Sequence, residues 1–108
     1  MGMNTPQRDA ELERQIAERV SATLNHCFEN CERAMRDLAV PGMLMVMGGA
    51  YFAEGATYHA WLELDGVVID PTCYLADAYP IYYDATEYYT LDQIEAIRTR
   101  DGGFFIRE

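Results

Sequence analysis

The sequence predicts an α+β fold in which N-terminal helices pack on a small antiparallel sheet. Up to about residue 39, apolar residues recur at intervals of three and four, as in amphipathic helices. Short apolar runs separated by turn residues follow, which is typical of antiparallel strands. The chain has 108 residues, half of them hydrophobic, and this is enough for one core. We therefore expect a single domain over residues 1–108.

The first helix is expected to begin at Thr5-Pro6, which resembles an N-cap followed by proline at the first helical position. Ile16, Val20 and Leu24 then recur at intervals of four on a highly charged segment. This spacing predicts a helix that ends near Leu24.

A second helix is expected over residues 26–39, with Asn25 as its cap and Pro41-Gly42 as its stop. Cys27 then lies in the first turn. Unpaired backbone N–H groups and the positive end of the helix dipole favour a thiolate at that position. Cys27 is therefore the candidate nucleophile of the chain.

A β-hairpin is predicted around Asp65-Gly66, because these two residues between apolar runs favour the positive φ angles of a type I′ turn. If Leu64 lies opposite Val67 and the second strand continues through Thr72, then Trp61 lies opposite Asp70 and His59 opposite Thr72. His59 and Asp70 are then diagonal neighbours on one face of the ribbon. The opposite face is wholly apolar and is expected to face the core; it consists of Ala60, Leu62, Leu64, Val67 and Ile69. An earlier strand is expected at about residues 43–52.

A histidine and a carboxylate on one face indicate part of a catalytic triad. In such a triad the carboxylate orients the imidazole, and the imidazole activates a nucleophile. Cys27 would be the nucleophile, His59 the general base and then the acid, and Asp70 the orienting group. The alternative is that this polar face is an ordinary solvated surface.

Three further residues are candidates for supporting roles. The side-chain amides of Asn25 and Asn30 could donate to an oxyanion, although capping is the preferred role of Asn25. The backbone N–H of Cys27 is a better oxyanion donor than either amide. Trp61 would lie beside Asp70 and shield its hydrogen bond to the histidine from water, or else pack under the helix of Cys27.

Four short blocks of sequence carry a family resemblance: Cys27–Asn30, Tyr51–Gly55, His59–Leu62 and Val68–Thr72. In this order they resemble small bacterial and phage proteins of the transglutaminase-like, papain-related cysteine superfamily. The resemblance covers about residues 25–83. It implies a papain/transglutaminase-like core and a triad of cysteine, histidine and aspartate, at positions 27, 59 and 70. It also implies thiol chemistry on amides: proteolysis, deamidation or acyl transfer.

The sequence departs from that family in two places. Cys31 stands where many relatives have alanine after the asparagine of the cysteine block. From Asp84 onward the chain matches no block of the family.

The formal charge of −10 argues against binding to nucleic acid or to anionic lipid, because both are bound mainly through clusters of Lys and Arg. The longest apolar run, residues 43–47, is far shorter than the roughly 20 residues that span a bilayer. The charged N-terminal segment has no apolar stretch typical of a signal peptide. We therefore expect a cytoplasmic protein with a protein or peptide substrate, and neither nucleic acid nor a membrane as a partner.

Three cysteines, an odd number without a secretion signal, indicate reduced thiols. The chain has no C-x-x-C pair, so zinc is disfavoured, and we expect no metal and no cofactor. Cys31 and Cys73 are expected to be small buried residues. A resolving thiol is the alternative role of Cys31.

The C-terminal third is rich in tyrosine without accompanying basic residues, which argues against stacking on bases. The tyrosines are expected to cover the edge of the sheet. Thr90–Gln93 has the pattern of a capping box, so a third helix is predicted from Leu91 to the glycines at 102 and 103, followed by a strand at residues 104–106.

Two functions are consistent with these observations. The first is a thiol-dependent amide hydrolase or acyltransferase that uses Cys27, His59 and Asp70. The alternative is a non-catalytic adaptor or inhibitor that binds a partner protein through an acidic, tyrosine-rich surface.

Overall fold

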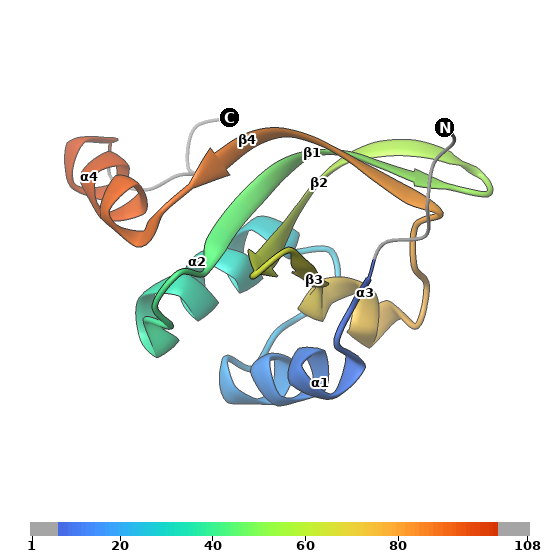
Figure 1. Cartoon of the computed structure of the whole chain (residues 1–108), viewed down its shortest axis with the longest axis horizontal. Coiled ribbons are helices and arrows are strands. Elements are labelled where there is room, and N and C mark those ends of the chain that lie inside the picture. Colours follow the sequence, from blue (N-terminus) through green and yellow to red (C-terminus); the bar gives the residue numbers. More distant parts are fainter. Residues whose placement is uncertain (1–6, 102–108) are drawn as a thin grey trace.

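The computed structural model describes residues 7–101. In chain order, the elements of this range are α1 (Ala10–Arg19), α2 (Cys27–Leu38), β1 (Leu44–Phe52), β2 (Gly55–Leu64), β3 (Val67–Ile69), α3 (Pro71–Ala76), β4 (Tyr82–Tyr89) and α4 (Leu91–Asp101). In Figure 1, α1, α2 and α3 lie below the sheet, and α4 lies beyond one end of it. The predicted α+β fold with a small antiparallel sheet is confirmed.

The sheet has the strand order β3-β2-β1-β4, and each neighbouring pair is antiparallel. The β2–β3 hairpin has the predicted register: Leu64↔Val67, Glu63↔Val68 and Leu62↔Ile69. Its turn residues have positive φ angles, 54° at Asp65 and 80° at Gly66, as the type I′ turn requires. The last pair between these strands is Leu62↔Ile69, where β3 ends. The N-terminal half of β2 therefore continues beyond the end of β3, toward the candidate site.

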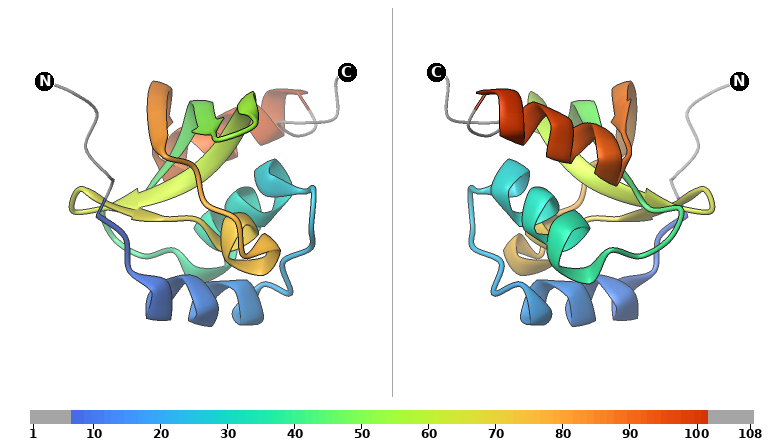
Figure 2. Two further views of the ribbon diagram at one scale, coloured as in Figure 1. Left: turned by 90° about the vertical axis from the view of Figure 1, so that its right-hand side faces the viewer. Right: turned by 90° about the vertical axis from the view of Figure 1, so that its left-hand side faces the viewer.

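The main core lies between the sheet and the helices α1, α2 and α3, and Figure 2 shows these three on one side of the sheet, with α1 farthest from it. Its buried residues are Ile16, Val20, Cys31, Ala34, Met35, Met43, Met45, Met47, Ala60, Leu62, Ile69 and Ile94. Most of the apolar hairpin face predicted to face the core belongs to this cluster. A smaller cluster lies on the other face of the sheet and consists of Trp61 and Val68 of the hairpin and Val46 of β1. That face is therefore not the solvated surface of the alternative interpretation.

Helix α1 begins later than predicted. Its first residue is Ala10, and Asp9 is the N-cap, because the Asp9 side chain accepts a hydrogen bond of 3.0 Å from the backbone N–H of Leu12. Immediately before it, Arg8 forms a parallel bridge to β3. Thr5-Pro6, where the sequence predicted the cap, lies outside the described residues.

The segment between α1 and α2 also differs from the prediction. Helix α1 ends at Arg19 instead of near Leu24, because Ser21 turns the chain with a φ of 54°. The N-cap of α2 is His26 and not Asn25, which has a left-handed φ of 64°. Both helices are thus shorter than the periodicity suggested, and a loop of residues 20–26 brings the chain to the start of α2.

Two elements, α3 and β4, were not predicted from the sequence. The strand expected to continue through Thr72 ends at Ile69, because Asp70 caps α3 and Pro71 takes its first position. Strand β4 contains several of the tyrosines that were expected only to cover the edge of the sheet. It pairs with β1 and forms the edge itself.

The capping box before α4 is confirmed. The backbone N–H of Thr90 donates to Oε1 of Gln93 at 2.8 Å, and the backbone N–H of Gln93 donates to Oγ1 of Thr90 at 3.2 Å. The strand predicted at residues 104–106 lies outside the described residues. Within residues 7–101, none of the helices has the length and apolar character needed to cross a membrane.

Candidate functional site

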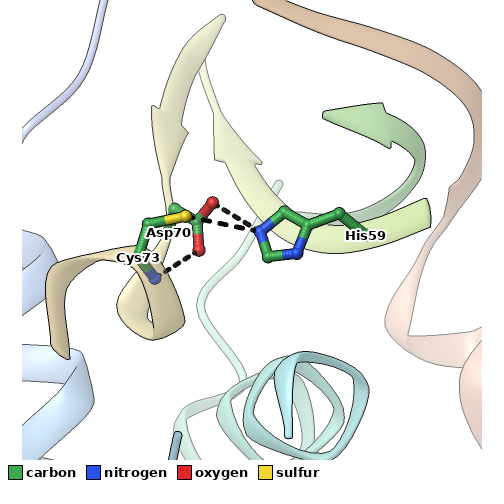
Figure 3. A group of neighbouring side chains, drawn as sticks. All are labelled: His59, Asp70 and Cys73. Carbon is green, nitrogen blue, oxygen red and sulfur yellow. Dashed lines mark hydrogen bonds and ion pairs between the residues drawn. The ribbon is translucent and has the colours of Figure 1, made fainter. Parts of the chain in front are cut away.

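His59 and Asp70 meet where the β2–β3 hairpin ends. His59 lies in β2, and Asp70 directly follows β3. Nε2 of His59 is 2.8 Å from Oδ2 of Asp70, and Figure 3 shows the ring and the carboxylate facing each other. Asp70 has no exposed surface, and His59 is 6% exposed. The diagonal contact predicted from the hairpin register is confirmed.

The start of α3 holds the Asp70 carboxylate in a defined orientation. Oδ1 of Asp70 accepts a hydrogen bond of 3.0 Å from the backbone N–H of Cys73, as an N-cap residue does. Its other oxygen, Oδ2, faces His59. One carboxylate thus caps a helix and orients an imidazole.

The two groups stabilise each other's charged form. Burial alone would lower the pKa of His59, but the hydrogen bond to Asp70 and contacts with the Cys27 and Cys73 thiols raise this pKa above its ordinary value. Burial alone would raise the pKa of Asp70, but the hydrogen bond and charge of His59 and the Cys73 backbone N–H lower it. The contact therefore favours the imidazolium and the carboxylate over their neutral forms.

Cys27 opens α2 and lines the same pocket as His59. The pocket has a volume of about 330 Å³ and is lined by Asn25, Cys27, Phe28, Thr57, Tyr58, His59 and Thr72. Because Nε2 of His59 faces Asp70, the second ring nitrogen, Nδ1, remains for the thiol; Figure 3 shows the two nitrogens on opposite sides of the ring. Burial lowers the pKa of His59, and the Asp70 hydrogen bond and then the neighbouring Cys27 thiol outweigh that effect and raise it. The structure thus brings Cys27, His59 and Asp70 together.

Cys73 is a second thiol beside the imidazole, and the sequence indicated only a packing role for it. Its Sγ lies 3.7 Å from Nε2 of His59. Cys73 is 4% exposed and Cys31 is fully buried, and burial raises the pKa of both thiols. Cys27 is half-buried, so it is the most accessible of the three free cysteines.

One group of donor atoms has the proximity that a metal site needs. Ligand atoms of His59, Asp70 and Cys73 lie within 4.8 Å of one another among the described residues. However, Nε2 and Oδ2 already satisfy each other, and Oδ1 accepts the Cys73 N–H. Zinc would need the Nε2 lone pair and would break that hydrogen bond. We therefore interpret the group as a hydrogen-bonded histidine–carboxylate pair with a neighbouring thiol, and not as a metal centre.

Three residues that are distant in sequence surround Asp70, and the sequence analysis missed them. The Tyr83 hydroxyl donates to Oδ2 of Asp70 at 2.8 Å, and the backbone N–H of Asp70 donates to Oε2 of Glu13 at 2.9 Å. Nη2 of Arg8 donates to Oε2 of Glu13 at 3.0 Å and to the Tyr83 hydroxyl at 3.3 Å. One signal was present: Glu13 lies three residues before Ile16, on the apolar stripe of α1.

The expected oxyanion role of Asn30 is wrong. Both hydrogens of its side-chain amide are used, because Nδ2 donates to the carbonyl of Thr23 and to Oγ1 of Thr72, each at 2.8 Å. Asn30 therefore ties the loop before α2 to α3. Asn25 is not the helix cap but lines the pocket.

Trp61 lies beside the imidazole and is fully buried. Its ring is stacked with that of His59 at a centroid distance of 6.0 Å and contacts the Tyr83 ring at 4.5 Å. It belongs to the cluster with Val46 and Val68, across the sheet from the core that α2 covers, so packing under the helix of Cys27 is wrong. Shielding of the histidine from water stays a prediction, which this position supports.

No protein-family model, curated protein or solved structure matches this chain. Its function is therefore inferred from the chemistry of its own residues.

Proposed function

We propose that this protein is a thiol-dependent amide hydrolase or acyltransferase that uses Cys27, His59 and Asp70. One observation carries the proposal. A buried imidazole is paired at 2.8 Å with a fully buried carboxylate, and it lines the same pocket as a cysteine at a helix start. This combination is what thiol catalysis requires: an activated sulfur, a proton carrier and a group that orients the carrier.

The proposed reaction uses these groups in two stages, acylation of the thiol and its release. The Cys27 thiolate attacks the amide carbon, which forms a C–S bond, and the C–N bond then breaks. His59, as imidazolium, gives its Nδ1 proton to the departing amine. Water or another amine attacks the thioester, His59 takes the proton of the attacking group, and the C–S bond breaks to regenerate the thiolate. Water as the attacking group gives hydrolysis, and an amine gives acyl transfer.

The helix start also supplies a candidate oxyanion donor. The first N–H groups of a helix have no partner within it, and Cys27 is the first residue of α2. When the sulfur of Cys27 attacks the substrate, negative charge develops on the substrate's carbonyl oxygen. The backbone N–H of Cys27 is close to this sulfur and can donate to that oxygen. Asn25, on the rim of the same pocket, is the second candidate.

The four sequence blocks of the transglutaminase-like superfamily add support to this proposal. Three of the blocks supply Cys27, His59 and Asp70: the first two line one pocket, and Asp70 is paired with His59. A papain/transglutaminase-like core and a cytoplasmic location are part of the same proposal.

A protein or peptide substrate suits the walls of the pocket. Its lining contains no carboxylate, lysine or arginine, and the rings of Phe28 and Tyr58 contact each other with their centroids 5.8 Å apart. Aromatic rings beside the thiol favour an apolar side chain next to the reacting amide.

The alternative, a non-catalytic adaptor or inhibitor, is favoured by one feature of the surface. Large side chains of β1, β2 and β4 are exposed, including Tyr51 at 39%, Tyr58 at 56% and Tyr88 at 52%. Tyrosine is enriched at protein interfaces, and the chain is strongly acidic. A binding function would not depend on the sulfur of Cys27.

A comparison of two cysteine variants tests the proposal. The substrates are a mixture of internally quenched peptides for hydrolysis, and the same mixture with a fluorescent primary amine for transfer. We expect Cys27→Ala to lose all turnover, and Cys31→Ala, one turn along the same helix, to keep it. Turnover that survives in Cys27→Ala, or its absence from the wild type over the whole mixture, would contradict the proposal and favour the adaptor.

A further inference from the structure

We propose that Arg8, Glu13 and Tyr83 are positioning residues that hold the Asp70 carboxylate against His59, and that the segment from Arg8 to Glu13 is thereby part of the site. Their importance for turnover rests on the proposed function. Their effect on the His59–Asp70 pair does not, and it can be measured without a substrate.

Tyr83 acts directly on the carboxylate. Its hydroxyl donates at 2.8 Å to Oδ2, the oxygen that also faces His59. With the Cys73 N–H on Oδ1, the carboxylate has three donors, which together fix its position and its plane. The Tyr83 ring is packed against Trp61 at 4.5 Å, so its hydroxyl cannot swing away freely. Burial and the charge of Asp70 raise the pKa of Tyr83, so this hydroxyl remains a donor at neutral pH.

Glu13 acts on the backbone of the same residue. The N–H of a helix N-cap residue has no partner within its helix, and at Asp70 it donates to Oε2 of Glu13 at 2.9 Å. Glu13 is fully buried, and Oε1 accepts a hydrogen bond of 3.4 Å from the Tyr79 hydroxyl. A carboxylate buried in α1 thus fixes the point at which β3 turns into α3.

Arg8 connects the two contacts. Its Nη2 donates to Glu13 and to the Tyr83 hydroxyl, and its guanidinium lies over the Tyr79 ring at 3.9 Å. Burial raises the pKa of Glu13, whereas the Asp70 N–H and the charge of Arg8 oppose that effect. A buried carboxylate without a cation would be costly, so Arg8 is what permits Glu13 to remain at this position.

The groups that face the pair come from every neighbouring element. Tyr83 faces the His59–Asp70 pair from β4, Glu13 faces it from α1, and Arg8 lies just before α1. The thiols that face the pair from α2 and α3 are Cys27, Cys31 and Cys73. Apart from His59 itself, only Arg8 in this set carries a positive charge at neutral pH. A variant that removes one donor from Asp70 without changing any charge therefore gives the cleanest test.

Tyr83→Phe is that variant, and Tyr79→Phe is its matched control. Each loses one hydroxyl from the same network around Arg8, but only the hydroxyl of Tyr83 reaches Asp70. The readout is the Nε2 resonance of His59 in ¹⁵N-histidine NMR, first at about pH 7 and then through an acid titration. Substitution of a residue that only supports the fold would not change specifically the resonance of the nitrogen that is bonded to Asp70.

We expect the Nε2 resonance to move in Tyr83→Phe and to stay at its wild-type position in Tyr79→Phe. In acid, the midpoint at which Asp70 gains its proton should rise by about one pH unit in Tyr83→Phe, because a carboxylate that loses a donor holds its charge less well. Identical Nε2 resonances in Tyr83→Phe and the wild type, or equal changes in both variants, would overturn the proposal.

Glu13 is tested by rescue with a conservative variant. Glu13→Gln keeps a carbonyl that can accept the Asp70 N–H, whereas Glu13→Ala removes the acceptor. We expect the Nε2 resonance of Glu13→Gln to be closer to the wild type than that of Glu13→Ala. Equal resonances in the two variants would remove Glu13 from the proposal. If Glu13→Ala does not fold, the Tyr83→Phe comparison still decides the case.

Failure of this inference can be distinguished from failure of the proposed function. A wild type without turnover whose Nε2 resonance responds to Tyr83→Phe would contradict the enzyme and leave the positioning role intact. A wild type with Cys27-dependent turnover, whose Nε2 resonance does not respond to Tyr83→Phe, would support the enzyme and contradict the positioning role.

Discussion

At the scale of single residues, burial decides the chemistry of the site. Asp70 is fully buried and still favours its charged form, because its two oxygens accept from His59, Tyr83 and Cys73. Burial without such donors would have produced a neutral acid. Burial also makes the three cysteines differ in solvent access, since Cys31 and Cys73 are buried and Cys27 is half-exposed.

The variant Asp70→Asn tests the strength of the buried pair. It leaves His59 buried without its partner, which should lower the free energy of unfolding by about 3–5 kcal/mol. The contribution of Asp70, whose pKa is lowered, is present above its ordinary value of 3.8 and is lost as the pH falls through the folded value. The contribution of His59, whose pKa is raised, is present below 6.5 and is lost as the pH rises through the folded value.

The stability difference between the wild type and Asp70→Asn should therefore be largest between about pH 4 and 6.5. Urea unfolding at about pH 3, 5.5 and 9 measures it, given that the group pKa values set this window. A difference that does not change with pH would show that the pair is not charged in the folded protein.

The three thiols should differ in their rate of alkylation. Cys27 should react first with iodoacetamide, because Cys31 and Cys73 are 0% and 4% exposed and burial raises the pKa of both. Peptide mapping after brief labelling of the native protein gives the order, and labelling in denaturant, where all three should react alike, is the control. Preferential labelling of Cys73 would make it the better candidate for the nucleophile.

At the scale of elements, three chain reversals assemble the site. The Asp65-Gly66 turn sets the register of β2 and β3, and the N-cap at Asp70 turns the chain from β3 into α3. The return along β4 then brings Tyr83 to the carboxylate. The first of these reversals depends on local sequence, whereas the last depends on the pairing of β4 with β1.

That pairing depends on a close approach at Gly48, where the register of β1 and β4 shifts. A Cβ at Gly48 would lie 2.1 Å from the backbone oxygen of Asp84, whereas a Cβ at Gly49 would meet only the side chain of Tyr51 at 3.1 Å. Gly48→Ala should therefore lower the free energy of unfolding by about 1–3 kcal/mol or more, as overpacking does.

Gly49→Ala is the control for this prediction, and urea unfolding of both variants is the measurement. Gly49→Ala should leave the free energy of unfolding nearly unchanged, because the exposed side chain of Tyr51 can move aside. Since β4 carries Tyr83, Gly48→Ala should also disturb the Nε2 resonance of His59. If the two alanine variants have equal free energies of unfolding, β1 and β4 can move apart at Gly48 with little loss of stability, which would contradict the prediction.

At the scale of the whole molecule, the acidic charge opposes the compact state. The formal charge of −10 is distributed over a chain with a radius of gyration of 13.2 Å. The exposed ion pairs of Arg14 with Glu11 and Glu18 offset little of this repulsion, because surface pairs contribute about 1 kcal/mol or less. Repulsion among the acidic groups should therefore dominate the response of the protein to salt.

Added salt should stabilise the protein. Raising NaCl from about 10 to 200 mM shortens the Debye length from roughly 30 Å to below 10 Å, so repulsion across the molecule is screened. We expect the Tm to rise by a few degrees, since about 1 kcal/mol corresponds to about 4–8 °C in a domain of this size. Calorimetry with NaCl and KCl at equal ionic strength measures it. A fall in Tm would indicate that ion pairs outweigh the repulsion.

The sequence by itself determined the features that depend on short-range geometry. The type I′ turn follows from the conformational preferences of Asp65 and Gly66, and the register of the hairpin then follows from the twofold period of strands. This is why the contact between His59 and Asp70 could be predicted from spacing alone. The capping box at Thr90 is equally local. The cap and proline of α3 were also readable from Asp70-Pro71, but a strand was predicted there instead.

Only the tertiary structure decided what surrounds that contact. Glu13 and Tyr83 contact Asp70 from distant parts of the chain, Arg8 joins these two residues, and no periodicity relates the three to Asp70. Their proximity results from the packing of α1 below the hairpin and from the pairing of β4 with β1, which depend on the burial of a shared core. The same packing buries the imidazole and the carboxylate, and burial is what makes their charges depend on each other.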